Sequence, residues 1–236
     1  MRILLVPIFF ALSVSLNAQT ASKLPLGAKP TGVPLQQGSR MDMFVTNRAI
    51  DVSQFNGIEG SPFLSEEYQQ AFIKTKTGEQ FNNAWIKFST YSNEILLENA
   101  SQLVALTNVD SVSYVEQPDN HEKTNIILKT GYPSIENKTA ETIYQILAYH
   151  KDLQFLKYYQ TKVETVKKMG MPDQKTFVTV PQYYIYSAAG KSMKRIKLNK
   201  SIIDEFQDYP NARKRATDLA TNFKDEGDVI MFINGL

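Results

Sequence analysis

The chain has 236 residues, of which 42% are hydrophobic and 21% are charged, and this composition excludes global disorder, a coiled coil and a polytopic membrane protein. Its 26 Lys and Arg residues and 24 Asp and Glu residues give a net charge of +2. A protein that binds nucleic acid usually carries a larger positive charge. Cysteine is absent, which excludes disulfides, thiolate nucleophiles and metal sites built on cysteine.

Residues 1–18 have the three regions of a secretory signal peptide. Arg2 supplies the positive charge, an apolar stretch follows, and Ala18 precedes Gln19. The apolar stretch contains Pro7 and is shorter than the roughly 20 residues that span a bilayer. We therefore expect export with removal of this leader. No cysteine is present for lipidation, and no transmembrane segment is expected after cleavage.

Residues 19–40 predict a flexible N-terminal arm. The stretch is interrupted by proline and glycine and has no hydrophobic period. It therefore lacks the apolar surface that would offset the entropy of ordering it. A partner-binding tail is the alternative. The β-rich body is expected to follow, over residues 41–198.

Short strands are predicted along the first part of this body. In the clearest one, residues 84–91, apolar Ile86 and Phe88 alternate with Trp85 and Lys87. This period of two is typical of a half-buried antiparallel strand. We expect Trp85, the only tryptophan, to be substantially buried. Further strands are predicted at residues 71–77, 94–98, 103–106, 112–115 and 126–129.

Residues 141–168 are ambiguous. Their apolar residues could populate one side of a long helix, because the stretch contains neither glycine nor proline. Two aromatic-rich runs separated by His150-Lys151-Asp152 would equally suit a β-hairpin. Periodicity leaves both structures open.

A tyrosine-rich strand is predicted at residues 181–187, returning after a turn over 193–198. Residues 199–236 then predict a helical segment. Asn199 is a candidate N-cap for a first helix, and Pro210 suits the first turn of a second helix that continues to Phe223.

A third helix is predicted after Asp225. It carries four large apolar residues close together, and a free tail would leave them in water. We expect this helix to dock onto the preceding helices through Leu219 and Phe223. The four residues are Val229, Ile230, Phe232 and Ile233.

Several of these segments resemble uncharacterised exported β-rich proteins of Bacteroidetes. The segments are Gly60-Ser61-Pro62-Phe63 before the strand at 84–95, the paired tyrosines from Tyr183, and the Lys-rich hairpin and helices behind them. In that group a Gly-[Ser/Thr]-Pro-aromatic segment precedes a strand with Tyr-Asn-x-Tyr. The present chain departs from the pattern at Phe88-Ser89-Thr90, where an asparagine would be typical.

The predicted fold is therefore α+β, with an antiparallel β-meander body and short C-terminal helices. The resemblance favours a hairpin over a long helix for residues 141–168. It implies no activity and no site residues, because the group has no established activity.

Catalytic patterns are weak in this chain. Gly190-Lys191-Ser192 resembles the end of a Walker A loop, but Ile185 stands where the motif needs a glycine, so we interpret it as a turn. His121 and His150 have neither a nucleophile motif nor a second histidine at metal-ligand spacing, and both are interpreted as loop residues.

Charged groups are interpreted as solvated surface. The acids at Glu66-Glu67 and in the stretch 204–208 suit exposed faces or helix ends. We interpret the basic residues of the last hairpin as a solvent-exposed face that protects an edge strand from aggregation. Such a set could also bind single-stranded nucleic acid or lipid head groups. They are Lys191, Lys194, Arg195, Lys197 and Lys200.

The leading hypothesis is a non-catalytic binding or assembly module, exported to the periplasm or cell envelope. An envelope protein or an apolar ligand is the expected partner, with neither a cofactor nor a metal and no nucleic acid. Alternatives are a carrier of lipid on a curved open sheet and a hydrolase that uses carboxylates or His150. The residues expected to contact the partner are Trp85, Tyr91, Tyr184 and Tyr186.

Overall fold

The computed structural model describes residues 45–99, 102–116, 123–167 and 172–236. The predicted leader and arm and His121 lie outside the described residues. The strands are β1 Val45–Ile50, β2 Ile58–Glu59, β3 Gln69–Thr75, β4 Gln80–Ser89, β5 Glu94–Asn99, β6 Gln102–Leu106, β7 Val109–Glu116, β8 Thr124–Lys129, β9 Tyr144–His150, β10 Leu153–Val166, β11 Gln174–Ser187 and β12 Ser192–Ile196. The helices are the 3-10 helices η2 Val52–Phe55 and η3 Lys200–Phe206, and the α-helices α1 Ala212–Asp218 and α2 Glu226–Asn234.

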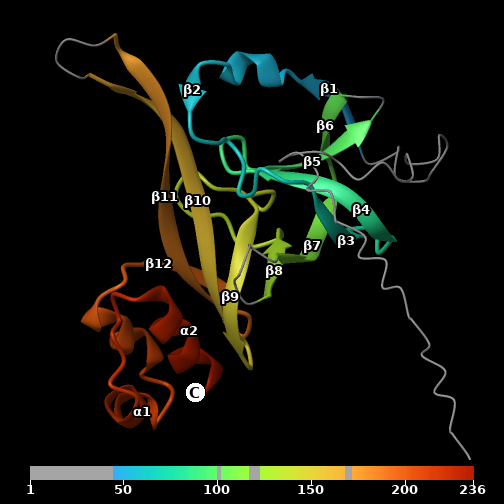
Figure 1. Ribbon diagram of the computed structural model, residues 1–236. Coiled ribbons are helices and arrows are strands. Elements are labelled where there is room, and N and C mark those ends of the chain that lie inside the picture. Colours follow the sequence, from blue (N-terminus) through green and yellow to red (C-terminus); the bar gives the residue numbers. More distant parts are fainter. Residues whose placement is uncertain (1–44, 100–101, 117–122, 168–171) are drawn as a thin grey trace, which may run out of the picture.

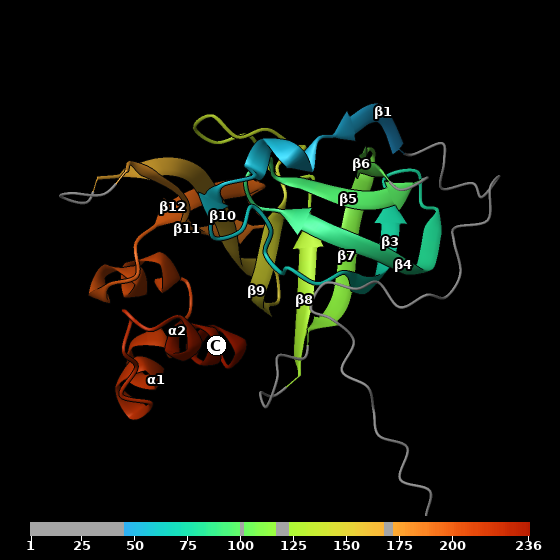
Figure 2. The same ribbon diagram turned by 45° about the horizontal axis from the view of Figure 1, so that its top comes forward.

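The strands form one sheet of twelve, in the order β1-β6-β5-β4-β3-β7-β8-β9-β10-β11-β12, with β2 beside β11. Neighbours are antiparallel except β2 and β11. The helices η3, α1 and α2 follow the last strand and lie at the opposite end of the sheet from β3–β5 (Figures 1 and 2). The predicted α+β class and its antiparallel body with short C-terminal helices are confirmed.

A short connection forces part of this sheet to roll up. Only Thr107 and Asn108 join β6 to β7, although these strands lie four positions apart in the sheet. Four strand spacings in a flat sheet are about 19 Å, whereas the three Cα steps from Leu106 to Val109 reach at most about 11 Å. Asn108 takes a left-handed φ of 59°, which asparagine tolerates. We call strands β3–β7 the roll.

Apolar side chains fill the inside of the roll. Ile86 and Phe88 of β4 point into it, as their alternation predicts, and Tyr159 of β10 closes it with its ring centroid 6.3 Å from that of Phe88. The buried residues of this core are Ala71, Ile73, Ala84, Ile86, Phe88, Ile95, Leu97, Val104, Val109, Val112, Tyr114, Ile126, Leu128 and Ile143.

The described part of the ambiguous stretch, residues 141–167, forms the hairpin that the resemblance favoured. β9 and β10 pair around Lys151-Asp152, with His150 opposite Leu153. β10 then runs beside β11 over fourteen residue pairs, a ribbon much longer than the predicted strand at 181–187. Pro181 is tolerated inside β11 because it falls between the positions that pair with β2 and those that pair with β12.

A second core lies between β9–β12 and the C-terminal helices. Val229, Phe232 and Ile233 of α2 are completely buried, so docking of the third helix is confirmed. Its N-cap is also as predicted, because the Asp225 carboxylate accepts a hydrogen bond from the Asp228 backbone N–H, at 3.0 Å. The buried members of this core are Ala148, Leu153, Phe155, Ile185, Ile196, Ile202, Phe206, Ala212, Phe223, Val229, Phe232 and Ile233.

Two details of the helical segment differ from the prediction. The first helix is 3-10 rather than α, although Asn199 caps it by accepting from the Ser201 N–H. The second helix does not reach Phe223, because Ala220 adopts a left-handed φ of 48° and ends it. This turn sends Phe223 into the core and leaves Leu219 48% exposed, so the predicted docking role of Leu219 is wrong.

None of the helices in the described part of the chain is long and apolar enough to cross a bilayer. The short C-terminal helices instead bury their apolar faces against the sheet.

Adjacent residues of α2 offer a test of the docked helix. Phe232→Ala is expected to lower the free energy of unfolding by about 3–5 kcal/mol, because it opens a cavity among rings of the second core. Met231→Ala is the matched control, since Met231 is 60% exposed and its loss should cost no more than about 0.5 kcal/mol. Denaturant titration measures both, and equal effects would contradict the docked arrangement.

Candidate functional site

The four residues expected to contact a partner do not converge on one surface. Tyr184 is completely buried, and half-buried Tyr186 packs against the same aromatic cluster. Tyr91 lies elsewhere and is 45% exposed. Trp85 is mostly buried, as expected, and lies on the outer face of β4 rather than in the core of the roll. Whether any of them contacts a ligand stays a prediction.

The cluster around Tyr184 holds the β8–β9 loop against the sheet. Lys138, from that loop, is 7% exposed, and its Nζ lies 4.6 Å from the ring centroid of Tyr158 and 5.6 Å from that of Tyr184. Its charge is paired with the Glu136 carboxylate at 3.3 Å. Burial raises the pKa of Tyr184 to about 12. Tyr184 therefore packs and orients a loop and offers no accessible surface.

Tyr91 belongs to a triad of rings from three distant segments. Phe55 of η2, Tyr91 of the β4–β5 turn and Phe177 of β11 meet edge to face, with ring centroids 5.5–5.7 Å apart. Each ring packs against both others, which leaves no space between them for a ligand. The triad holds the far end of the β10–β11 ribbon against the roll.

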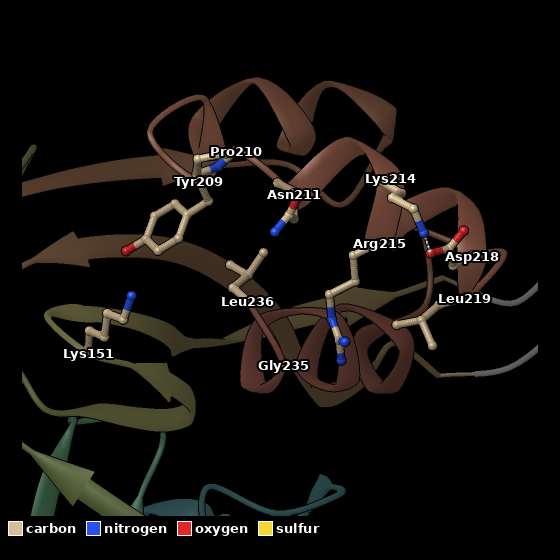
Figure 3. Close-up of a pocket in the computed structure, with 11 residues that line it drawn as sticks. Lys151, Tyr209, Pro210, Asn211, Lys214, Arg215, Asp218, Leu219, Gly235 and Leu236 are labelled. Atoms are coloured by element: carbon tan, nitrogen blue, oxygen red, sulfur yellow. Dashed lines mark hydrogen bonds and ion pairs between the residues drawn. The ribbon is translucent and has the colours of Figure 1, made fainter.

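A large hollow lies between the β9–β10 turn and the C-terminal helices (Figure 3). Its volume is about 610 Å³, and its lining comprises Lys151, Tyr209, Pro210, Asn211, Ala212, Lys214, Arg215, Asp218, Leu219, Gly235 and Leu236. Lys214 pairs with Asp218 at 2.5 Å, and Arg215 donates to the backbone carbonyls of Met231 and Phe232, each at 3.2 Å. Arg215 therefore holds α1 and α2 together, whereas Lys214 is paired within α1.

A hydrolytic site does not assemble from the predicted groups. Among the described residues, no three His, Asp or Glu side chains lie close enough to hold a metal ion. Asp204 is paired with Arg213 at 3.0 Å, and Glu205 with Lys194 at 2.7 Å. His150 stacks edge to face on Tyr209, and its buried Nε2 has no hydrogen-bond partner.

The basic hairpin lies where the edge-strand interpretation requires. β12 is the last strand of the sheet, and its Arg195 pairs with Glu136 at 3.1 Å. Gly190-Lys191 forms the turn before it, with Lys191 at a φ of 44°, so the turn interpretation of the Walker-like motif is confirmed.

A second hollow, which sequence reasoning missed, lies on the outer face of β4, β3, β7 and β8. We call it the outer groove. Its volume is about 430 Å³, and amide and hydroxyl groups surround an aromatic ring and an exposed valine. Its lining residues are Gln70, Ala71, Phe72, Asn82, Asn83, Ser113, Tyr114, Val115 and Asn125. None of these side chains carries a charge at neutral pH.

A β-bulge shapes the outer groove. Ala71 pairs with Ala84 and Ile73 pairs with Phe81, so one residue of β3, Phe72, faces Asn82 and Asn83 of β4. Asn83 takes a left-handed φ of 59°. Both asparagines are exposed. Bulges of this kind bend a strand and redirect its side chains, and they are over-represented beside functional sites.

Cross-strand neighbours extend the groove on both sides. Gln70 pairs with Trp85, which places the indole beside the groove on the same outer face. Val115, 55% exposed, pairs with Asn125. Side chains directly opposite in adjacent strands lie about 5 Å apart, so these groups form one continuous surface. The only sequence signal was the unusual pair Asn82-Asn83 next to an otherwise regular strand.

The bulge gives a test of this geometry. Asn83→Val is expected to lower the free energy of unfolding by about 1–2 kcal/mol, because a β-branched residue resists a left-handed φ. Asn83→Gly should change it by no more than about 0.5 kcal/mol. Asn82→Val is the matched control, since Asn82 is an exposed neighbour without a positive φ. A cost for Asn82→Val equal to that for Asn83→Val would contradict the bulge.

The close approach of Arg215 to Gly235 gives a test of how α1 is held to α2. A Cβ atom at residue 235 would lie 1.7 Å from Arg215 Nη2, so Gly235→Ala must displace the guanidinium from the α2 carbonyls. We expect a loss of about 1–3 kcal/mol of stability. Arg215→Ala should cost a similar amount, and the double variant little more, because both changes break one contact. If denaturant titrations show that the losses of unfolding free energy from the two single variants add up in the double variant, the two changes do not break one shared contact.

Comparison with protein-family models, with curated proteins and with solved structures gives no match for this chain. The resemblance to exported Bacteroidetes proteins therefore stays a prediction. The described surfaces that could hold a partner include the hollow of Figure 3 and the outer groove.

Proposed function

We propose that the protein is a non-catalytic binding module, exported to the periplasm or cell envelope, that holds its partner in the outer groove. Export rests on the predicted leader. The observation that carries the binding role is the bulge at Asn82-Asn83, which lies beside Phe72 and lines a neutral groove on the outer face of the sheet. A strand that only had to cover the roll would gain nothing from this interruption.

The outer groove is a better candidate than the hollow of Figure 3. In that hollow, Arg215 of α1 already donates to backbone carbonyls of α2, and Lys214 is paired with Asp218 within α1, so a ligand would compete with contacts that stabilise the helices. The groups of the outer groove that could bind a ligand, Gln70, Asn82, Asn83 and Asn125, are all exposed. They exchange water for a ligand without breaking a contact of the fold.

A lipid carrier has less support. An apolar ligand would lie on the inner face of the curved sheet. There the chain's own side chains occupy the space, with Ile86 and Leu97 completely buried. The apolar surface of the outer groove is small and mixed with amides, which suits a polar partner.

Photo-crosslinking in the producing cell tests the proposal. Val115 is replaced by p-benzoylphenylalanine, which inserts into C–H bonds of any molecule held against it. The same replacement at Val180 is the matched control, because Val180 is a strand valine of similar exposure, 45% against 55%, on the β10–β11 ribbon. We expect a defined adduct from position 115 and none from position 180, detected by gel shift and mass spectrometry.

No adduct at position 115, or equal adducts at both positions, would overturn the groove as the binding site. Retention of the leader on the protein isolated from the envelope would contradict export. N-terminal sequencing reads that outcome independently of the crosslink.

A further inference from the structure

We infer that the ligand of the outer groove is a neutral oligosaccharide. This inference rests on the proposed function and names the chemical class of its partner. The groove offers what a sugar ring presents to a protein: partners for many hydroxyl groups, an apolar surface for the C–H face, and no charge.

The polar groups match hydroxyls. Each hydroxyl of a sugar donates and accepts a hydrogen bond, and so does each amide side chain, through its NH₂ group and its carbonyl oxygen. Four exposed amides and one serine surround the hollow, contributed by β3, β4, β7 and β8: Gln70, Asn82, Asn83, Asn125 and Ser113. A set of lysines, arginines or carboxylates could not offer both functions in one side chain.

The apolar groups match the flat face of a pyranose ring. Phe72 lies at the floor of the groove and is half-buried, and Trp85 lies on the same outer face across from Gln70. Val115 adds an exposed aliphatic surface. Aromatic rings give large, rigid contact areas with little loss of side-chain entropy, which suits a ligand whose C–H groups line one side.

The charges in and around the outer groove disfavour an ionic ligand. The lining carries no ionisable side chain that is charged at neutral pH. Three lysines lie further along this face: Lys74 and Lys129 are paired with Asp110, at 3.8 and 3.2 Å, and Lys87 donates to the Glu66 backbone carbonyl. An acidic polysaccharide, a phosphate or a nucleic acid would therefore find no free counter-charge here.

The position of the groove in the sheet argues against an extended peptide. Peptides that bind sheets commonly add a strand to an open edge. β3 and β7, which carry the centre of the groove, are paired with a strand on both sides, so their backbone groups are already used. A ligand over these two strands is recognised by side chains, which is how sugars are recognised.

Tryptophan fluorescence and titration calorimetry test the inference on the full chain. Trp85 is the only tryptophan, so its emission reports this face specifically. The probes are the neutral hexasaccharides cellohexaose, laminarihexaose, mannohexaose, maltohexaose and chitohexaose, with hexagalacturonate as the anionic comparison. We expect saturable binding of at least one neutral probe, with a shift in emission, and at least tenfold weaker binding of hexagalacturonate.

Two exposed strand glutamines provide the matched variants. Gln70→Ala is expected to weaken binding of the neutral probe about tenfold, the loss of one to two hydrogen bonds. Gln174→Ala, on the β10–β11 ribbon, should leave it unchanged. Asn83→Gly removes an amide while keeping the bulge and should also weaken binding. Thermal unfolding of each variant should match that of the parent chain.

The outcomes separate the two proposals. If no neutral probe binds, or Gln174→Ala weakens binding as much as Gln70→Ala, the inference is overturned. If Val115 then still crosslinks to a protein, the groove remains a binding site with a different partner. If position 115 gives no adduct as well, the proposed function falls with the inference.

Discussion

The two-residue connection Thr107-Asn108 is the constraint on which the rest of the structure depends. It joins strands that lie four positions apart in the sheet, and a flat sheet cannot satisfy it. Rolling β3–β7 encloses an apolar interior, and that interior is where the first core forms. Because rolling gives the sheet an inside and an outside, each side chain's position along its strand decides whether it packs or faces solvent.

The same rolling leaves the outer face of β4, β3, β7 and β8 as the accessible surface of the body. The other end of the sheet is covered by α2, which packs on β9 and anchors Glu226 to Lys157 and Tyr183, at 2.8 and 2.7 Å. Hydrophobic packing and a partly buried ion pair therefore stabilise this end of the sheet. The opposite end keeps a neutral, hydrated face, where the bulge at Asn82-Asn83 interrupts the pairing of β3 and β4.

The candidate site was the least predictable part of the molecule. Trp85 was singled out correctly as a residue of an alternating strand, but nothing in the sequence placed it beside Gln70. That pairing joins β4 to β3, whose neighbours are set by the roll. Tyr184 is the opposite case. Its alternating strand suggested an accessible side chain, but the loop that carries Lys138 covers it.

The sequence by itself determined the strands with a clear period of two, the antiparallel body and the short helical tail, because alternation, turns and caps are local properties of the chain. Asp225 and the apolar group around Phe232 specified the last helix and its docking in this way. Only the tertiary structure decided the strand order, the long β10–β11 ribbon and the outer groove. These depend on pairings between residues far apart in the chain, and Asn83 illustrates the reason: its left-handed φ has meaning only opposite Phe72 of the neighbouring strand.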